Sequence, residues 1–507
     1  MINSPLFSLS RYYLLLGTFI VGVPAKVLSQ AGNFPVRDSI AFHPRWVNNQ
    51  IFLSLMNPPA PAKDQMLYLW AEAALFGKQY DSYASLLDYA QFQQYCEEHG
   101  IDLLGGPMLG DVTHQSASVW VRTVKPAEVS VNVMIEGKEH TFGPVATTPS
   151  TQLSGVVRIT GLQAGTNYPY QVELNGEAVS IPEGASITTA PAENTGTTRL
   201  AFGSCFHRWG LGNGTQTQTL LNRQPLAFIG LGDIVAQDKL NRINWHTLDY
   251  LSRDLYPAWQ QLVSQIPFYA LWDDHDYFGN DLAGIPDGFT KVDRDQVWGV
   301  FRHAWNNPAY GNGKQGVYFR SRIGSADLIV IDHRYFRTEE SLLGKEQMQW
   351  LKDQLLDCEG PFIVLAMGTM WSDYVSDGKD SWGAVDPNGR EEIFNFIEKN
   401  NIPGVVLISG DRHGSRGFRL PRPSGYQFYE FECASLGGLS GAPASRPEWN
   451  TQLYGMSGGY AFGEFTFDPQ PEDPTATFRL VDERGNYLHE TTLKRSQLTP
   501  ANFFDKK

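Results

Sequence analysis

The chain has 507 residues, of which 42% are hydrophobic, a length that suits roughly two or three globular domains. Its formal net charge of -14, from 54 acidic and 40 basic residues, argues against a nucleic-acid partner, which would require a basic face. Only four cysteines occur and no pair has the CxxC spacing, which excludes a disulfide scaffold. They are Cys96, Cys205, Cys358 and Cys433.

Residues 1–31 predict a secretory signal peptide. Arg11 supplies a charged n-region, Tyr12 to Val23 an apolar core, and Ser29 or Ala31 a small residue for cleavage. The apolar core has about twelve residues, whereas a membrane-spanning helix needs roughly 20. We therefore expect an exported protein, periplasmic or extracellular, with no stable membrane span.

The next two regions differ in their hydrophobic period. Residues 33–104 are predicted to be helical, because apolar residues recur at three- and four-residue spacing in 66–75 and 83–100. From residue 105 short alternating runs separated by Gly, Pro and Asn turns predict a β-sandwich over 105–190. Such a domain is either a spacer or a binding module, and we favour the spacer.

Residues 198–507 alternate apolar strands with helices, which predicts the fold class α/β. Buried strands are expected at 199–202, 226–231, 267–272, 326–331, 361–367 and 404–408, and helices at 345–356 and 390–399. Largely apolar strands are typical of a sheet that is covered on its faces. In such sheets the ligand binds outside the carboxyl ends of the strands.

Chemically active side chains follow five of these six strands. They lie in Gly203-Ser204-Cys205, Gly232-Asp233, Asp273 to Asp281, Asp332-His333-Arg334 and Asp411-Arg412-His413. Each segment alone has an ordinary explanation, since a Gly-Asp pair can cap a helix and a single Cys is usually a small buried hydrophobe. Their repetition at one edge is less easily explained, because buried carboxylates are costly together unless a cation offsets their charge.

The sequence therefore predicts a set of ligands for more than one metal ion at this edge: Cys205, Asp233, Asp274, His275, Asp411 and His413. A nucleophilic serine is disfavoured, because no G-x-S-x-G elbow surrounds Ser204. Nucleotide cofactors are disfavoured too, since neither a P-loop nor a GxGxxG follows any strand. Metal-assisted hydrolysis fits the pattern best.

Six segments in this order resemble the PhoD-type alkaline phosphatases, which belong to the calcineurin-like metallophosphoesterases: GSCFHRW, GLGDIVAQD, WDDHDYFGND, VIDHRYFR, LLGKEQMQWL and SGDRHGS. The resemblance runs from about Gly105 to the C-terminus. It implies an αββα sandwich preceded by a fibronectin- or immunoglobulin-like β-sandwich, and the short helical segment predicted from its spacing lies outside it. It also implies an exported phosphomonoesterase or phosphodiesterase that uses iron and calcium.

The resemblance also implies roles for single residues. It gives the metal ligands as Cys205, Asp233, Asp274, Asp332, Asp411 and His413. His275 is the implied proton donor to the leaving group, and Arg334 the implied phosphate contact, for which a guanidinium is well shaped. Certain members carry a Tyr shortly after the Cys as an iron ligand; His207 is the alternative ligand in this chain.

We thus expect an exported metal-dependent phosphoesterase that acts on small phosphate mono- or diesters. The alternative is a catalytically degenerate surface or binding protein on the same scaffold. A phospholipid, a nucleic-acid backbone or a phosphonate stays open as the substrate. The aromatic residues Trp371, Tyr374 and Trp382 either shape a leaving-group pocket or pack a long loop.

Overall fold

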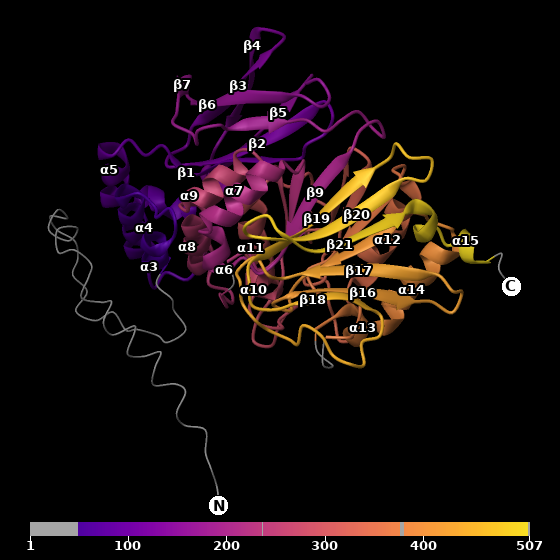
Figure 1. Cartoon of the computed structure of the whole chain (residues 1–507). Helices are drawn as coiled ribbons and strands as arrows, with labels where there is room; N and C mark the ends of the chain where they lie inside the picture. Colours follow the sequence, from indigo (N-terminus) through magenta and orange to yellow (C-terminus); the bar gives the residue numbers. More distant parts are fainter. Residues whose placement is uncertain (1–48, 236, 376–379, 505–507) are drawn as a thin grey trace, which may run out of the picture. The chain divides into compact units, whose positions relative to one another are not determined.

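The computed structural model of the protein describes residues 49–235, 237–375 and 380–504 (Figure 1). The predicted signal peptide and the start of the predicted helical segment lie outside the described residues. Within these ranges we find no helix with the length and apolar content that a membrane crossing requires. All four cysteines are free thiols.

The described part of the N-terminal segment is helical. It comprises α3 (Asn49–Leu55), α4 (Ala62–Leu75), the 3₁₀ helix η2 (Tyr83–Asp88) and α5 (Ala90–Glu98). Apolar residues of these helices, such as Leu67 and Leu86, lie in one core with α8 (Ile243–Asp254). Asn49 adds a polar tie, because its Nδ2 donates to Asp249 Oδ1 over 2.9 Å.

Two antiparallel sheets follow. The strands are β1 (Leu103–Gly110), β2 (Ser116–Thr123), β3 (Glu128–Ile135), β4 (Lys138–Ala146), β5 (Ser154–Thr160), β6 (Asn167–Leu174), β7 (Glu177–Ala178) and β8 (Ser186–Thr188). One sheet has the order β1-β2-β5 and the other β4-β3-β6-β7, with β8 paired to β6. Val119 of the first sheet and Val131 of the second share one buried cluster, so the two sheets pack against each other.

The six predicted strands all form, but they divide between two larger sheets. The first sheet contains β9 (Thr198–Gly203), β10 (Ala227–Leu231), β11 (Phe268–Leu271), β19 (Ala461–Asp468), β20 (Thr475–Asp482) and β21 (Tyr487–Lys494). The second contains β12 (Phe319–Ile323), β13 (Ala326–Val330), β14 (Phe362–Ala366), β15 (Val405–Ser409), β16 (Ser415–Pro421), β17 (Gln427–Cys433) and β18 (Gln452–Met456). Strands β9 to β11 are parallel, as are β13, β14, β15 and β17.

The two sheets stack face to face between helices (Figure 1). Phe202 of β9 shares a buried cluster with Val364 of β14, so both point into the space between the sheets. Their neighbours Ala201 and Leu365 belong to two different outer clusters, as the two-residue period of a strand requires. The first outer layer contains α7 (Gly214–Arg223), α8, α9 (Pro257–Val263) and α11 (Lys291–Ala304). The second contains α12 (Gly344–Asp357) and α14 (Pro387–Lys399), which gives a four-layer mixed α/β arrangement.

Backbone contacts join the carboxyl ends of the parallel strands across the two sheets. Ser204 follows β9, and its Oγ accepts a hydrogen bond from the Asp411 amide over 3.0 Å. The Ser204 amide donates to the Cys433 carbonyl oxygen over 2.9 Å. The amide of Cys205 donates to Gly232 O, after β10, over 3.2 Å. The chemically active segments of both sheets therefore lie at one shared edge.

Candidate metal centre

Potential metal ligands converge at this shared edge. Within the described residues, ligand atoms of His, Cys and Asp lie within 4.8 Å of one another in four groups. The groups are Cys205, His207 and His413; Asp233, Asp274 and His275; Asp233, Asp273, Asp274 and Asp411; and Asp274, Asp281 and Asp380. Asp233 and Asp274 recur, so the carboxylates form one continuous cluster.

Several of these residues adopt an unusual backbone conformation. The φ angles are 57° for Cys205, 48° for His207, 53° for Asp233, 80° for Asp411 and 41° for His413. Left-handed backbone at a residue other than Gly costs on the order of 1–3 kcal/mol and collects at functional sites. Each turn out of a strand is tight, and together the turns direct these side chains to one place.

Two carboxylates of the cluster, Asp233 and Asp411, are only partly compensated by nearby positive charge. Burial and the neighbouring Asp274 raise the pKa of Asp233 well above its usual range, and burial and Asp273 do the same for Asp411. Among the residues that the structure describes, no hydrogen-bond partner is found for the buried oxygens Asp233 Oδ1, Asp273 Oδ2 and Asp411 Oδ2, the last of which lies 3.6 Å from Arg412 Nη1. Divalent cations are bound by such oxygens, so the residues present fit a metal centre.

The thiol and two imidazoles stand beside the carboxylates. Cys205 Sγ lies 3.6 Å from Asp233 Oδ2, and burial together with Asp233 raises the pKa of this thiol well above its usual range. The Nε2 atoms of His207 and His413 are 3.3 Å apart. Burial and the His413 ring lower the pKa of His207 to about 3, so its imidazole is neutral.

His275 is oriented by residues of the β10–α8 connection. Its Nδ1 lies 2.8 Å from Asp238 Oδ1, and its carbonyl accepts from Lys239 Nζ over 2.8 Å. Burial alone would lower the pKa of His275, but the Asp238 hydrogen bond and the Asp274 charge outweigh it and raise this pKa. The side chain remains 23% exposed, so it borders both the carboxylates and solvent.

Arg334 and Asp332 are not among the grouped ligands. Arg334 is fully buried, donates from Nε to Asp273 Oδ1 over 2.7 Å and also pairs with Asp380. Asp332 accepts from Trp272 Nε1 over 2.8 Å and from the Val317 amide over 2.9 Å. Both residues lie in the protein interior beside the cluster, and the phosphate contact and the metal ligand that the resemblance implied for them stay predictions.

A known sequence family matches the part of the chain that forms this edge. The sequence model of the PhoD-like phosphatase family matches residues 200–492. The chain belongs to this family. The family prediction is thus confirmed. A domain of unknown function, DUF7800, matches residues 101–192.

Individual proteins agree with the PhoD-like assignment. Alkaline phosphatase D of Bacillus subtilis (strain 168) is 26% identical over 325 residues, which are 53% of this chain and 54% of that protein. The chain thus spans about half the length of this curated relative. A solved structure of PhoD matches with a TM-score of 0.62 at 20% identity, covering 78% of this chain and 91% of that one. The structure of a purple acid phosphatase from yellow lupin (Lupinus luteus) seeds matches with a TM-score of 0.59 at 13% identity, covering 77% of this chain and 74% of that one. Both structural matches show similarity of the fold.

Sequence reasoning did not assign every member of the PhoD-like cluster. Asp273 and Asp281 stand in the acidic stretch that follows β11, and this composition was a usable signal. Asp380 lies in the long connection after β14, where no motif marks it. In the same connection Trp371 and Trp382 are fully buried with ring centroids 5.0 Å apart, which favours loop packing over a leaving-group pocket.

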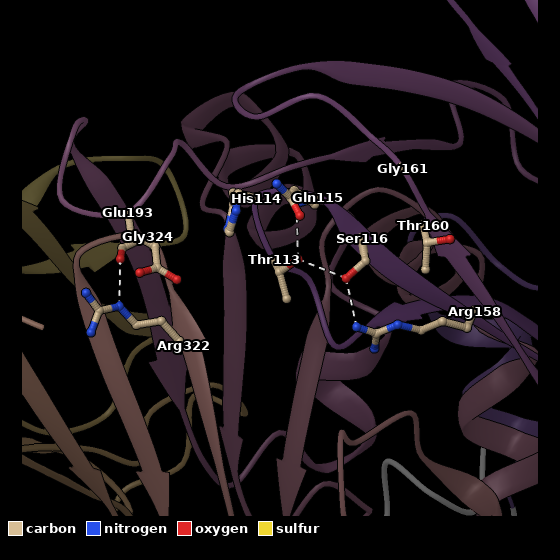
Figure 2. Close-up of a pocket in the computed structure, with 10 residues that line it drawn as sticks. All are labelled: Thr113, His114, Gln115, Ser116, Arg158, Thr160, Gly161, Glu193, Arg322 and Gly324. Atoms are coloured by element: carbon tan, nitrogen blue, oxygen red, sulfur yellow. Dashed lines mark hydrogen bonds between the residues drawn. The ribbon is translucent and has the colours of Figure 1, made fainter. Parts of the chain in front are cut away.

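A cavity of about 320 Å³ shares no lining residue with the PhoD-like cluster; it lies beside the β1–β2 turn, β5 and the β12–β13 turn (Figure 2). Its two guanidinium groups are already bonded within the protein. Arg158 donates to Ser116 Oγ over 2.7 Å and pairs with Asp111. Arg322 pairs with Asp327 over 2.7 Å. We therefore place the functional site at the metal-ligand cluster.

Proposed function

We propose that this chain is a metal-dependent phosphoesterase that hydrolyses small phosphate mono- or diesters. The observation that carries the proposal is the convergence of thiol, imidazole and carboxylate ligands at the edge shared by the two sheets. The net charge of -14 favours a small ester over a nucleic-acid backbone.

The metal ions that we propose are iron and calcium, following the family. Cys205 and His413 are suited to iron, the oxygen atoms of Asp273, Asp274 and Asp411 to calcium, and Asp233 borders both sets. When bound, such ions offset the charge of the phosphate and make water a better nucleophile at neutral pH.

The protein's own residues supply orientation and the proton. We propose that His275, which Asp238 orients and whose pKa Asp238 and Asp274 raise, gives a proton to the leaving oxygen of the ester. Arg334 fixes Asp273 and Asp380 in place, so it acts through these carboxylates. Asp332 anchors the turn that carries Arg334, because its Oδ1 accepts from the Arg334 amide over 2.9 Å.

The remaining organisation is proposed from sequence. We keep a signal peptide at 1–31 with export to the periplasm or the exterior, a helical segment at 33–104, a sandwich at 105–190 and the phosphatase domain at 198–507. For the sandwich we propose a fibronectin- or immunoglobulin-like spacer, in keeping with its two packed sheets.

The test is elemental analysis of the purified chain, with hydrolysis of an aryl phosphate and its bis ester measured before and after chelation. The expected result is bound metal and turnover that chelator abolishes, with at least about a 100-fold loss of kcat in Asp233→Asn. The control Asp353→Asn alters an exposed carboxylate on α12 and retains full turnover. Bound metal without turnover on either ester contradicts the proposal and favours a binding protein.

A further inference from the structure

Three ligand atoms form a set that differs chemically from the carboxylates. Cys205 Sγ and one ring nitrogen each of His207 and His413 lie within 4.8 Å of one another. They offer one sulfur and two nitrogens, whereas the neighbouring group of Asp233, Asp273, Asp274 and Asp411 offers only oxygen. The centre therefore contains one group of softer ligands, sulfur and nitrogen, beside one group of hard oxygen ligands.

We propose that His207 is a metal ligand and completes, with Cys205 and His413, a position selective for a borderline divalent ion, namely Zn²⁺, Fe²⁺ or Co²⁺. The inference rests on the proposed function for the presence of metal, and it assigns a ligand and an ion class that the function does not require. Thiolate and imidazole favour such ions over Ca²⁺ and Mg²⁺, which prefer oxygen.

The chain accepts unfavourable backbone to bring the two imidazoles together. His207 and His413 both have left-handed φ, 48° and 41°, although neither is a Gly. Their Nε2 atoms face each other over 3.3 Å, with the rings inclined by 60°. A solvent-facing histidine requires no such conformation, so the geometry indicates that these two nitrogens share a purpose.

A glycine-containing loop after β17 holds both turns. A Cβ at Gly437 would lie 2.7 Å from the carbonyl oxygen of Cys205 and 2.9 Å from Cδ2 of His207. A Cβ at Gly441 would lie 2.5 Å from Cβ of His413, and the Gly441 amide donates to the His413 carbonyl over 2.9 Å. The same short loop thus packs against both imidazole-bearing turns and fixes their separation.

The first experiment uses the unaltered chain. The protein is loaded with Co²⁺ after chelation, and its optical spectrum and X-ray absorption fine structure are recorded. We expect a thiolate-to-cobalt charge-transfer band and a first shell with one sulfur and two imidazoles. A first shell with sulfur and a single imidazole, or with oxygen alone, would overturn the assignment of His207, and the two rings would then be only a hydrogen-bonded pair.

A variant pair gives the second experiment. His207→Gln should weaken Zn²⁺ binding by at least about 10-fold, judged by competition with a chromophoric chelator, while Ca²⁺ binding stays unchanged. His114→Gln, which alters a half-buried histidine of the β1–β2 turn, should bind both ions as the unaltered chain does. Equal Zn²⁺ affinity in His207→Gln and His114→Gln contradicts the inference.

These outcomes separate the inference from the proposed function. Metal that binds through His207 without any ester hydrolysis retains the inference and contradicts the function. Chelator-sensitive hydrolysis with no imidazole from His207 in the metal shell supports the function and contradicts the inference. Circular dichroism of each variant establishes that a lost affinity reflects a lost ligand and a folded chain.

Discussion

At the scale of single residues, the pairing of His275 with Asp238 governs how the proposed proton donor behaves. The carboxylate lies 2.8 Å from Nδ1 of the ring and also accepts the Asn280 amide over 2.9 Å. It therefore ties the imidazole to the loop that follows β11. Partners of this kind orient a functional histidine and raise its basicity.

Asp238→Asn should lower kcat by about 10- to 100-fold without loss of bound metal. Asp238 helps to raise the pKa of His275, so its removal lets the ring lose its proton at lower pH. The alkaline limb of the kcat–pH profile should accordingly move to lower pH. An unchanged profile, or a variant that loses its metal, would show that Asp238 has a different role.

His246, in α8, makes stability sensitive to acid. It is fully buried, and burial together with Lys239 lowers its pKa to about 3. In the unfolded chain a histidine has a pKa of about 6.5, so below that pH the unfolded state binds a proton that the folded state does not. Stability should fall as pH drops below 6.5, by about 2 kcal/mol from this residue at pH 5.

Urea unfolding at pH 7 and pH 5 measures this effect. His246→Gln keeps a donor for the Leu240 carbonyl, which Nε2 of the native ring contacts at 3.0 Å, and has no titrating group. The variant should lose less stability between the two pH values than the unaltered chain does. If both proteins lose the same unfolding free energy between pH 7 and pH 5, groups other than His246 control the loss of stability in acid.

At the scale of elements, Gly437 in the loop after β17 should tolerate no side chain. Gly437→Ala places a methyl group 2.7 Å from two backbone oxygens, those of Cys205 and Phe206, so either the turn after β9 or the loop itself must move. We expect weaker metal binding and a lower melting temperature. Gly299→Ala, within α11 and with open space around it, should instead stabilise the chain by about 0.5–1 kcal/mol.

Differential scanning calorimetry with and without chelator tests this pair. The difference between the two alanine variants should be larger in the metal-loaded protein, because Gly437 acts through the turns that carry ligands. A Gly437→Ala protein with native metal affinity would disprove the packing argument. Gly299→Ala serves as the matched substitution at a site without close neighbours.

The burial pattern along each strand explains which parts of the fold could be predicted from the sequence. Strands β13, β14 and β15 are buried on both faces, and their continuous apolar runs identify them directly. The C-terminal strand β20 alternates buried and half-buried residues, and its apolar run is too short to stand out. The division into two sheets was expected only from the resemblance to an αββα sandwich, since Phe202 and Val364 meet from strands far apart in sequence.

For the candidate centre, the residues that the sequence pattern predicts are those that follow a strand directly. Cys205, Asp233 and Asp411 are of this kind, and all three lie in the ligand groups. Asp380 comes from an irregular connection, and only tertiary structure brings it near Asp274. Asp332 and Arg334 follow β13 yet turn inward, because hydrogen bonds that no local pattern encodes hold them in the interior.

At the scale of the whole molecule, the region matched by DUF7800 shares its core with the phosphatase region. Trp120 of β2 is buried in the same cluster as Trp259 of α9, and its Nε1 donates to His303 O over 3.1 Å. Arg122 donates to the same carbonyl over 2.8 Å. The sandwich is therefore joined to the phosphatase region through a continuous core.

We expect residues 49–504 to unfold in a single calorimetric transition. Trp120→Ala should lower the stability of that whole transition by about 3–5 kcal/mol, since it removes a large buried side chain at the junction. Two transitions, of which only one responds to the substitution, would mean that the sandwich is an independent folding unit.

The pairing of β9 with β19 has a consequence for how the protein is made. Phe202, near the end of the strand that leads to Cys205, pairs with Gly463, which the ribosome adds much later. A nascent chain that ends before β19 leaves β9 as an open strand edge, prone to pair with other chains. The strand that leads to Cys205 thus gains its last neighbour only when nearly the full chain has been translated, and truncated products should aggregate without acquiring metal.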